Sequence, residues 1–182
     1  MKVLRNLRLK RFIANGGVVA YPTESCFGLG CDPQNFRGIK KLNILKNRPV
    51  TKNFILISSE LRQIKGIIKE FNKKQAQMLY AKWPGPHTWL IRANPKCPSW
   101  LKSNNKVAVR IPDLNTCQDL LSSIGMAITS TSANKAKQRP IKNYREACRQ
   151  YGQSVHIVKG RIGKNKKPSQ IQDFETKVII RR

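Results

Sequence analysis

The chain has 182 residues, 40% of them hydrophobic and 25% charged, which suits one folded domain over residues 1–182 with a sizeable core. Its 36 Lys and Arg against 9 Asp and Glu give a formal net charge of +27. The N-terminus lacks the apolar core of a signal peptide, and no apolar run reaches transmembrane length, so we expect a cytoplasmic protein without a membrane partner.

Apolar runs alternate with amphipathic segments along the chain, which predicts an α/β or α+β domain. The first predicted elements are a buried strand at GVVAY (17–21), a helix with apolar residues every third position from Phe36 to Leu45, and a strand at FILIS (54–58). The others are helices over 72–82, 117–124 (capped by Asn115 or Thr116) and 144–151, strands over 87–93, 107–111, 126–131, 155–158 and 177–181, and a mobile basic loop over 159–169.

The net charge has two interpretations of similar weight. Lys and Arg gain affinity for RNA by displacing the counterions of phosphates, which favours a polyanionic partner. The chain is also rich in Lys, Asn and Ile, which is typical of mutational bias toward A/T-rich codons. Such drift would spread Lys over every face, whereas a binding surface would concentrate it.

The cysteines are odd in number and have no CxxC spacing, which argues against a zinc site and favours free thiols in a reducing compartment. They are Cys26, Cys31, Cys97, Cys117 and Cys148.

The first motif, PTESCFGLGCDP, follows the first predicted strand. Thr23, Glu24 and Ser25 stand at the strand end, where open α/β sheets place ligand groups. Gly28 and Gly30 allow a close approach of the backbone. The segment is not a dinucleotide fingerprint, and by itself a glycine-rich turn from strand to helix explains it better than a site does.

The second motif, KNRPVTK, lies between a helix end and a strand. Lys46 in the last helical turn complements the helix dipole, which is a complete structural explanation for it. Pro49 stops the helix and biases Arg48 toward an extended conformation, which leaves its guanidinium free to bind phosphate oxygens. Lys52 follows, just before the strand.

Two further strands end in polar groups. After MAITS, the side chains of Ser130, Ser132 and Asn134 can bond phosphate, ribose or carboxylate oxygens, although helix capping alone would explain them. In VAVRIP, Arg110 is a charge within a strand otherwise fit for burial, and a bound carboxylate is one candidate partner. In WPGPHTWLI, the tryptophans are more typical of a core, and His87 of a structural role.

Together these segments resemble the YrdC/TsaC type of L-threonylcarbamoyladenylate synthases. YPTESCFGLGCDP, LKNRPVTKNFILI, WPGPHTWLI, VAVRIP, STSAN and PSQIQD occur in the family's order, from about Gly16 to the C-terminus. The resemblance implies a single YrdC-like α/β domain, with an open, twisted mixed sheet and flanking helices around a basic concave cavity. The implied reaction joins L-threonine, bicarbonate or CO2, and ATP into threonylcarbamoyl-AMP and pyrophosphate. A downstream complex then transfers the threonylcarbamoyl group to tRNA.

The resemblance also implies site residues. Lys46 and Arg48 match the family's KxR element and Ser132 and Asn134 its SxN element, so these four are the expected catalytic residues. They are also expected to bind ATP, together with Lys52 and Arg181. The expected threonine-binding residues are Thr23, Arg110, Ser130 and Ser169.

No Asp/Glu cluster suggests a metal cage in the protein, so we expect Mg2+ to arrive with ATP. The alternative function is a protein that binds double-stranded or ribosomal RNA without catalysis. Such a protein would not need a carboxylate-binding arginine in a strand.

Overall fold

The computed structural model describes residues 2–47, 54–136 and 138–181. Its described strands form one open nine-stranded sheet in the order β7-β1-β2-β6-β3-β5-β4-β8-β9. The strands are β1 (Val19–Pro22), β2 (Phe27–Gly30), β3 (Ile55–Ile57), β4 (His87–Arg92), β5 (Lys106–Arg110), β6 (Ile128–Ser132), β7 (His156–Ile157), β8 (Gln170–Asp173) and β9 (Ile179–Arg181). The pairs β1–β7, β3–β5 and β4–β8 are parallel and the other pairs are antiparallel, which confirms the predicted mixed α/β sheet.

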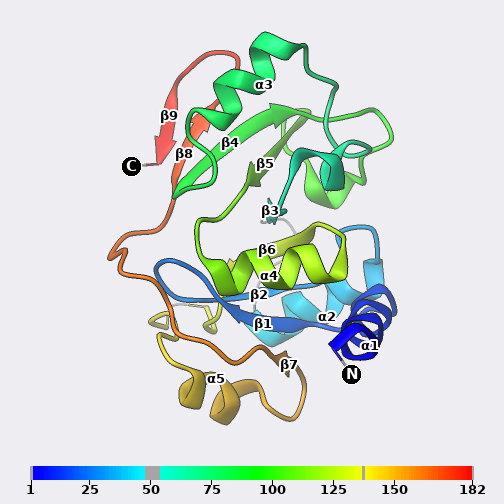
Figure 1. Cartoon of the computed structure of the whole chain (residues 1–182), viewed down its shortest axis with the longest axis vertical. Coiled ribbons are helices and arrows are strands. Elements are labelled where there is room, and N and C mark those ends of the chain that lie inside the picture. The colour runs from blue at the N-terminus through cyan, green and yellow to red at the C-terminus, as the bar shows by residue number, and fades with distance from the viewer. Residues whose placement is uncertain (1, 48–53, 137, 182) are drawn as a thin grey trace.

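The helices cover both faces of the sheet (Figure 1). They are α1 (Lys2–Ala14), α2 (Phe36–Lys46), α3 (Lys73–Tyr80), α4 (Asn115–Ile124) and α5 (Tyr144–Tyr151), with short 3-10 turns at Leu61–Ile64 and Ser99–Leu101. Alternate residues of β1 point to opposite faces: Val19 packs with residues of α1 and α4, and Ala20 packs with residues of α2 and α5. A third apolar cluster around Trp83 and Trp89 covers β4 and β5, so the prediction that both tryptophans belong to the core is confirmed.

Local sequence explains the bounds of α2. The Asn35 side chain accepts hydrogen bonds from the backbone N–H groups of Arg37 and Gly38, and Asn47 ends the helix in the left-handed conformation with φ 47°. The helix therefore delivers Lys46, its last residue, to a fixed position beside the sheet.

Several sequence-based expectations are wrong. No element was predicted over 2–14, 27–30 or 170–173, where α1, β2 and β8 lie. The N-cap of α4 is Leu114, which makes no side-chain cap, rather than Asn115 or Thr116. The glycine-rich segment after β1 is a hairpin of β1 and β2, not a turn into a helix. A Cβ at Gly30 would lie 2.1 Å from the carbonyl oxygen of Thr129, so the close approach that Gly30 allows is to β6.

The basic segment 159–169 is a loop, as predicted, but it is anchored to the end of β1. The backbone N–H of Gly163 donates to the carbonyl oxygen of Thr23 at 3.0 Å, and that of Asn165 to the carbonyl oxygen of Glu24 at 3.0 Å. A Cβ at Gly163 would lie 2.8 Å from Cα of Glu24. The loop therefore packs directly on the segment that holds Thr23 and Glu24.

Candidate functional site

The first part of the site joins the end of α2 to the end of β6. The ammonium of Lys46 donates to the carbonyl oxygens of Ser132 at 2.5 Å and Asn134 at 2.8 Å, and to Oδ1 of Asn134 at 3.2 Å. Lys46 is only 4% exposed. The helix dipole is therefore only a minor reason for a lysine at position 46, because the Lys46 side chain binds the predicted SxN residues directly.

The side chains of Ser132 and Asn134 organise a turn rather than cap a helix, so the capping alternative is wrong. The Ser132 hydroxyl donates to Oδ1 of Asn134 at 2.6 Å. Nδ2 of Asn134 donates to the carbonyl oxygens of Lys135 at 3.0 Å and Gln138 at 2.7 Å. The next helix, α5, is capped instead by the Asn143 side chain. Lys46 and this turn thus form one hydrogen-bonded unit.

The second part of the site centres on Arg110 at the end of β5. Its Nη2 forms an ion pair with Oε1 of Glu24 at 2.5 Å, and its Nε donates to the carbonyl oxygen of Gly85 at 2.9 Å. The arginine side chain is 11% exposed and the glutamate side chain 7%. The charge in this strand therefore has a partner within the protein, which the sequence-based argument for a bound carboxylate did not foresee.

Ser169 and Arg181 lie together beside β4. The Arg181 guanidinium donates from Nη2 to the carbonyl oxygen and hydroxyl of Ser169 at 2.7 Å and 3.1 Å. The Ser169 hydroxyl also bonds the Thr88 hydroxyl at 2.8 Å, where Thr88 is fully buried. Burial lowers the pKa of Arg181, and the nearby charge of Arg110 lowers it further, so both arginines belong to one neighbourhood.

The hairpin between β1 and β2 connects the two parts. The Thr23 hydroxyl donates to the carbonyl oxygen of Cys26 at 2.7 Å. Burial raises the pKa of the Cys26 thiol, while hydrogen bonds from Ser25 and Thr23 and the charges of Lys46 and Arg110 act in the opposite direction. Because the charges of both Lys46 and Arg110 act on Cys26, both cations lie near this hairpin.

Ser130 lies on the same strand as Ser132 and beside Tyr21. Burial is the main cause that raises the pKa of the Tyr21 phenol well above its usual value, and the nearby Cys117 thiol raises it further. A hydrogen bond with Ser130 opposes this shift, as does the charge of Arg110. Ser130 therefore lies next to the Tyr21 phenol, and its expected role in threonine binding stays a prediction.

Two of the predicted ATP-binding residues, Arg48 and Lys52, lie outside the described residues. Sequence reasoning also missed two residues that the contacts bring into the site. Glu24 was noted at the strand end without a role. An acidic side chain at that position was a usable signal, because the chain has only 9 Asp and Glu against 36 Lys and Arg. Thr88 gave no signal, because a threonine within a strand is ordinary.

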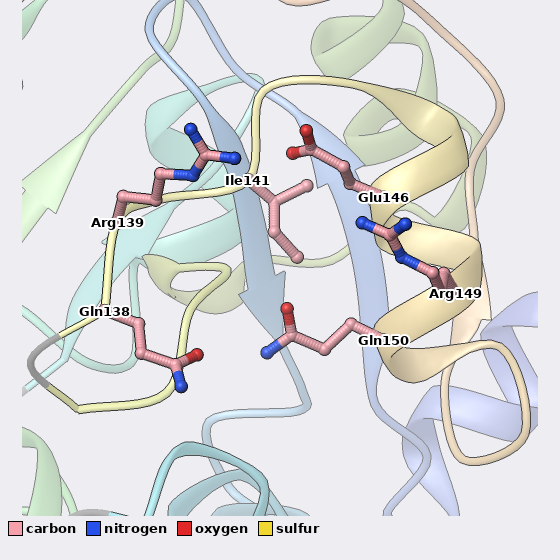
Figure 2. Close-up of a pocket in the computed structure, with 6 residues that line it drawn as sticks. All are labelled: Gln138, Arg139, Ile141, Glu146, Arg149 and Gln150. Carbon is pink, nitrogen blue, oxygen red and sulfur yellow. The ribbon is translucent and has the colours of Figure 1, made fainter.

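A pocket of about 330 Å³ opens beside the turn that Asn134 holds (Figure 2). Side chains from the loop and from α5 face one another across it, and they belong to Gln138, Arg139, Ile141, Glu146, Arg149 and Gln150. None of the predicted site residues that the structure describes is among them. The basic cavity expected around those residues stays a prediction.

His87 is 6% exposed, and its Nε2 is buried without a hydrogen-bond partner among the described residues. Burial lowers its pKa, with a smaller effect from the charge of Lys82. Its ring packs against Trp89 at 4.2 Å between centroids, consistent with the structural role predicted for it. The described cysteines are all free, as expected.

Within the described ranges, no three His, Cys, Asp or Glu side chains are grouped as metal ligands would be. None of the described helices combines the length and apolar character that a membrane span requires.

Sequence comparison gives close relatives over nearly the whole chain. The family model of the Sua5/YciO/YrdC proteins, described as telomere recombination, matches residues 11–182. The threonylcarbamoyl-AMP synthase of Methylobacillus flagellatus is 43% identical over 179 residues, which cover 98% of this chain and 99% of that protein. The threonylcarbamoyl-AMP synthase of Neisseria gonorrhoeae is 42% identical over 171 residues, covering 93% and 90%.

Solved structures share the fold at lower identity. E. coli YciO superposes with a TM-score of 0.81 at 22% identity, covering 100% of this chain and 90% of that one. P. abyssi Sua5 complexed with L-threonine gives a TM-score of 0.82 at 24% identity over 94% of this chain. This chain spans only 51% of the length of that Sua5 chain.

Proposed function

Because the chain belongs to the Sua5/YciO/YrdC family, we propose that it is a threonylcarbamoyl-AMP synthase, a nucleotidyltransferase. The observation that carries the proposal is the convergence of two kinds of site on one hairpin. Lys46 with the Ser132–Asn134 turn suits phosphate groups, and Arg110 with Ser169 nearby suits a carboxylate. A reaction between a nucleotide and an amino acid requires both.

The proposed reaction has two steps. The threonine amine combines with CO2 to form a carbamate and release a proton, or with bicarbonate to form the carbamate and water. A carbamate oxygen then forms a bond to the α-phosphorus of ATP, and the bond to the β-phosphate bridging oxygen breaks, so pyrophosphate leaves. Both reactants are anionic, so the main contribution of the protein is to position them and to offset their charge.

Within this scheme the ATP residues are Lys46, Arg48, Lys52, Ser132, Asn134 and Arg181, and the threonine residues are Thr23, Arg110, Ser130 and Ser169. The three hydrogen bonds of Lys46 support a specific role for it. An ammonium has three protons, so Lys46 acts on the triphosphate through its charge and by fixing the Ser132–Asn134 turn. Arg110 already binds Glu24 through Nη2, so the threonine carboxylate would bind its other amino group, Nη1.

Further parts of the proposal concern what surrounds the reaction. Mg2+ would arrive with ATP, and when bound it would supply positive charge that offsets the leaving pyrophosphate. The product passes to a complex that transfers the threonylcarbamoyl group to tRNA, which places the enzyme in the cytoplasm.

The placement of basic residues does not favour RNA binding as the function. Exposed Lys and Arg occur on elements that cover both faces of the sheet, including Lys10 on α1, Lys40 on α2, Lys74 on α3 and Arg149 on α5. Such a spread is what compositional drift predicts.

The test is pyrophosphate release from ATP by the purified protein with Mg2+. We expect release that requires both L-threonine and bicarbonate, so that omission of either substrate abolishes it. Folded protein that binds double-stranded RNA but releases no pyrophosphate under these conditions would contradict the proposal.

A further inference from the structure

We propose that Glu24 is a positioning residue of the threonine site. Its carboxylate fixes the guanidinium of Arg110, so that Nη1 of this arginine is offered to the carboxylate of the substrate. The inference rests on the proposed function and extends it, since Glu24 was assigned no role by the motifs.

The contacts of Glu24 fix Arg110 in one orientation. Oε1 of Glu24 bonds Nη2 of Arg110 at 2.5 Å and accepts from the backbone N–H of Asp113 at 2.6 Å. On its other side, Nε of Arg110 donates to the carbonyl oxygen of Gly85 at 2.9 Å. A planar guanidinium bonded at Nε and Nη2 cannot rotate, and its Nη1 edge is left for a ligand.

The backbone of Glu24 is anchored as well. Its carbonyl oxygen accepts from the backbone N–H of Asn165, and Gly163 packs against its Cα so closely that a Cβ there would lie 2.8 Å away. Glu24 thus joins the end of β1, the end of β5, the segment before α4 and the 159–169 loop. A carboxylate that is carried on this anchored backbone and also bonded to the Asp113 N–H suits a fixed support for Arg110.

Comparison with a second, partly buried ion pair on the same strand separates the orientation of Arg110 from a contribution to stability. At the other end of β5, Lys106 binds Oδ2 of Asp173 at 2.5 Å, and Oδ1 of Asp173 accepts from the backbone N–H groups of Glu175 and Thr176. Both oxygens of Asp173 are therefore bonded. Oε2 of Glu24, by contrast, is buried without a partner among the described residues, which costs stability. A pair that serves stability alone would satisfy both oxygens, so the Glu24 pair is better explained by the orientation of Arg110.

The charges agree with this role. Arg110 and Arg181 lie close enough that the charge of Arg110 acts on Arg181. Arg181, which the proposed function assigns to ATP, keeps the surroundings of the Arg110–Glu24 pair net positive, which suits an anionic substrate.

The test compares Glu24→Gln with Asp173→Asn, a matched control that removes the charge of the other, partly buried pair on β5. We expect Glu24→Gln to raise KM for threonine about tenfold, with kcat and KM for ATP changed less than about twofold. Asp173→Asn should lower the melting temperature and leave KM for threonine unchanged. Calorimetric titration with L-threonine should give the same tenfold weakening of Kd for Glu24→Gln without any turnover.

An unchanged or lower KM and Kd for threonine in Glu24→Gln would overturn the proposal, because a lower value identifies Glu24 as a competitor of the substrate. An equal rise in Asp173→Asn would overturn it as well. If Glu24→Gln does not fold, Glu24→Asp keeps the charge but shortens its reach, and the same weakening of threonine binding is expected. Wild-type protein that binds threonine but releases no pyrophosphate would contradict the proposed function alone, since calorimetry still tests the role of Glu24.

Discussion

The ammonium of Lys46 lies 2.8 Å from the carbonyl oxygen of Asn134 and 3.2 Å from its Oδ1, although 88 positions separate the two residues in the chain. The contact joins the C-terminal end of α2 to the end of β6, and it brings the lysine of the KxR motif to the SxN motif. Lys46 therefore stabilises the Ser132–Asn134 turn in addition to supplying positive charge to the site.

This double role predicts that Lys46→Ala loses both activity and stability. Three carbonyl-type acceptors would lose a charged donor in a buried site, so we expect turnover to be abolished and the free energy of unfolding to fall by about 1.5–3 kcal/mol. Urea unfolding and pyrophosphate release measure the two effects. Lys40→Ala, an exposed lysine on the same helix, is the control and should change stability by less than about 0.5 kcal/mol. An equal stability for both variants would show that the buried contacts of Lys46 contribute nothing.

Asn134→Asp tests the turn with almost no change in shape. The new oxygen would face the carbonyl oxygens of Lys135 and Gln138, which now accept from Nδ2, and would add a negative charge beside the triphosphate. We expect a loss of about 1–3 kcal/mol in stability and a rise of about tenfold in KM for ATP. Asn94→Asp is the control, because Asn94 Oδ1 accepts from Lys96 N–H and an Asp oxygen keeps that bond. Normal ATP binding by Asn134→Asp would remove Asn134 from the ATP site.

Variants at Ser169 and Thr88 distinguish a structural role of Ser169 from a role in threonine binding. Ser169→Ala leaves the buried Thr88 hydroxyl without its partner, so stability should fall by about 1–3 kcal/mol and KM for threonine should rise. The double variant Ser169→Ala/Thr88→Val removes both hydroxyls, and we expect it to recover most of the stability but none of the threonine affinity. Recovery of both in steady-state assays would show that Ser169 has a structural role only.

The Lys106–Asp173 pair predicts a pH dependence of stability. Burial alone would raise the pKa of Asp173, but the Lys106 ammonium and the backbone N–H groups of Thr176 and Glu175 outweigh it and lower the pKa. The stabilisation from this carboxylate is therefore present above an unfolded pKa of about 3.9 and is lost as the pH falls through the lower folded pKa. Asp173→Asn should be less stable than wild type by about 1.5–3 kcal/mol near pH 6, and the gap in urea unfolding should shrink toward pH 3. A gap that does not depend on pH would contradict the assignment.

The elements with strong periodicity could be predicted from the sequence. The apolar residues at every third position from Phe36 to Leu45 predicted α2, and the apolar runs at GVVAY and FILIS predicted β1 and β3. The missed elements lack such signals: α1 mixes charge into every apolar run, β2 reads as a glycine-rich turn, and β8 has the polar sequence QIQD. Gly30 in β2 is explained by the proximity of Thr129 in β6, which a local pattern cannot reveal.

For the site, the motifs identified the polar residues but not their partners. The sequence predicted that Arg110 needs a counter-charge, and the fold supplies Glu24, 86 positions earlier in the chain. It likewise predicted Lys46 at a helix end, but the three acceptors that surround its ammonium come from β6 and the turn after it. Such pairings depend on the tertiary arrangement of the strands, so they required the structure.

The most direct test of the account is to detect the product itself by mass spectrometry. Purified protein is incubated with ATP, Mg2+, L-threonine and isotopically labelled bicarbonate. We predict a threonylcarbamoyl-AMP species that carries the label in its carbamoyl carbon and forms in equal amount to pyrophosphate. Pyrophosphate without labelled product, or no reaction from folded protein, would contradict the assignment of this chain as a threonylcarbamoyl-AMP synthase.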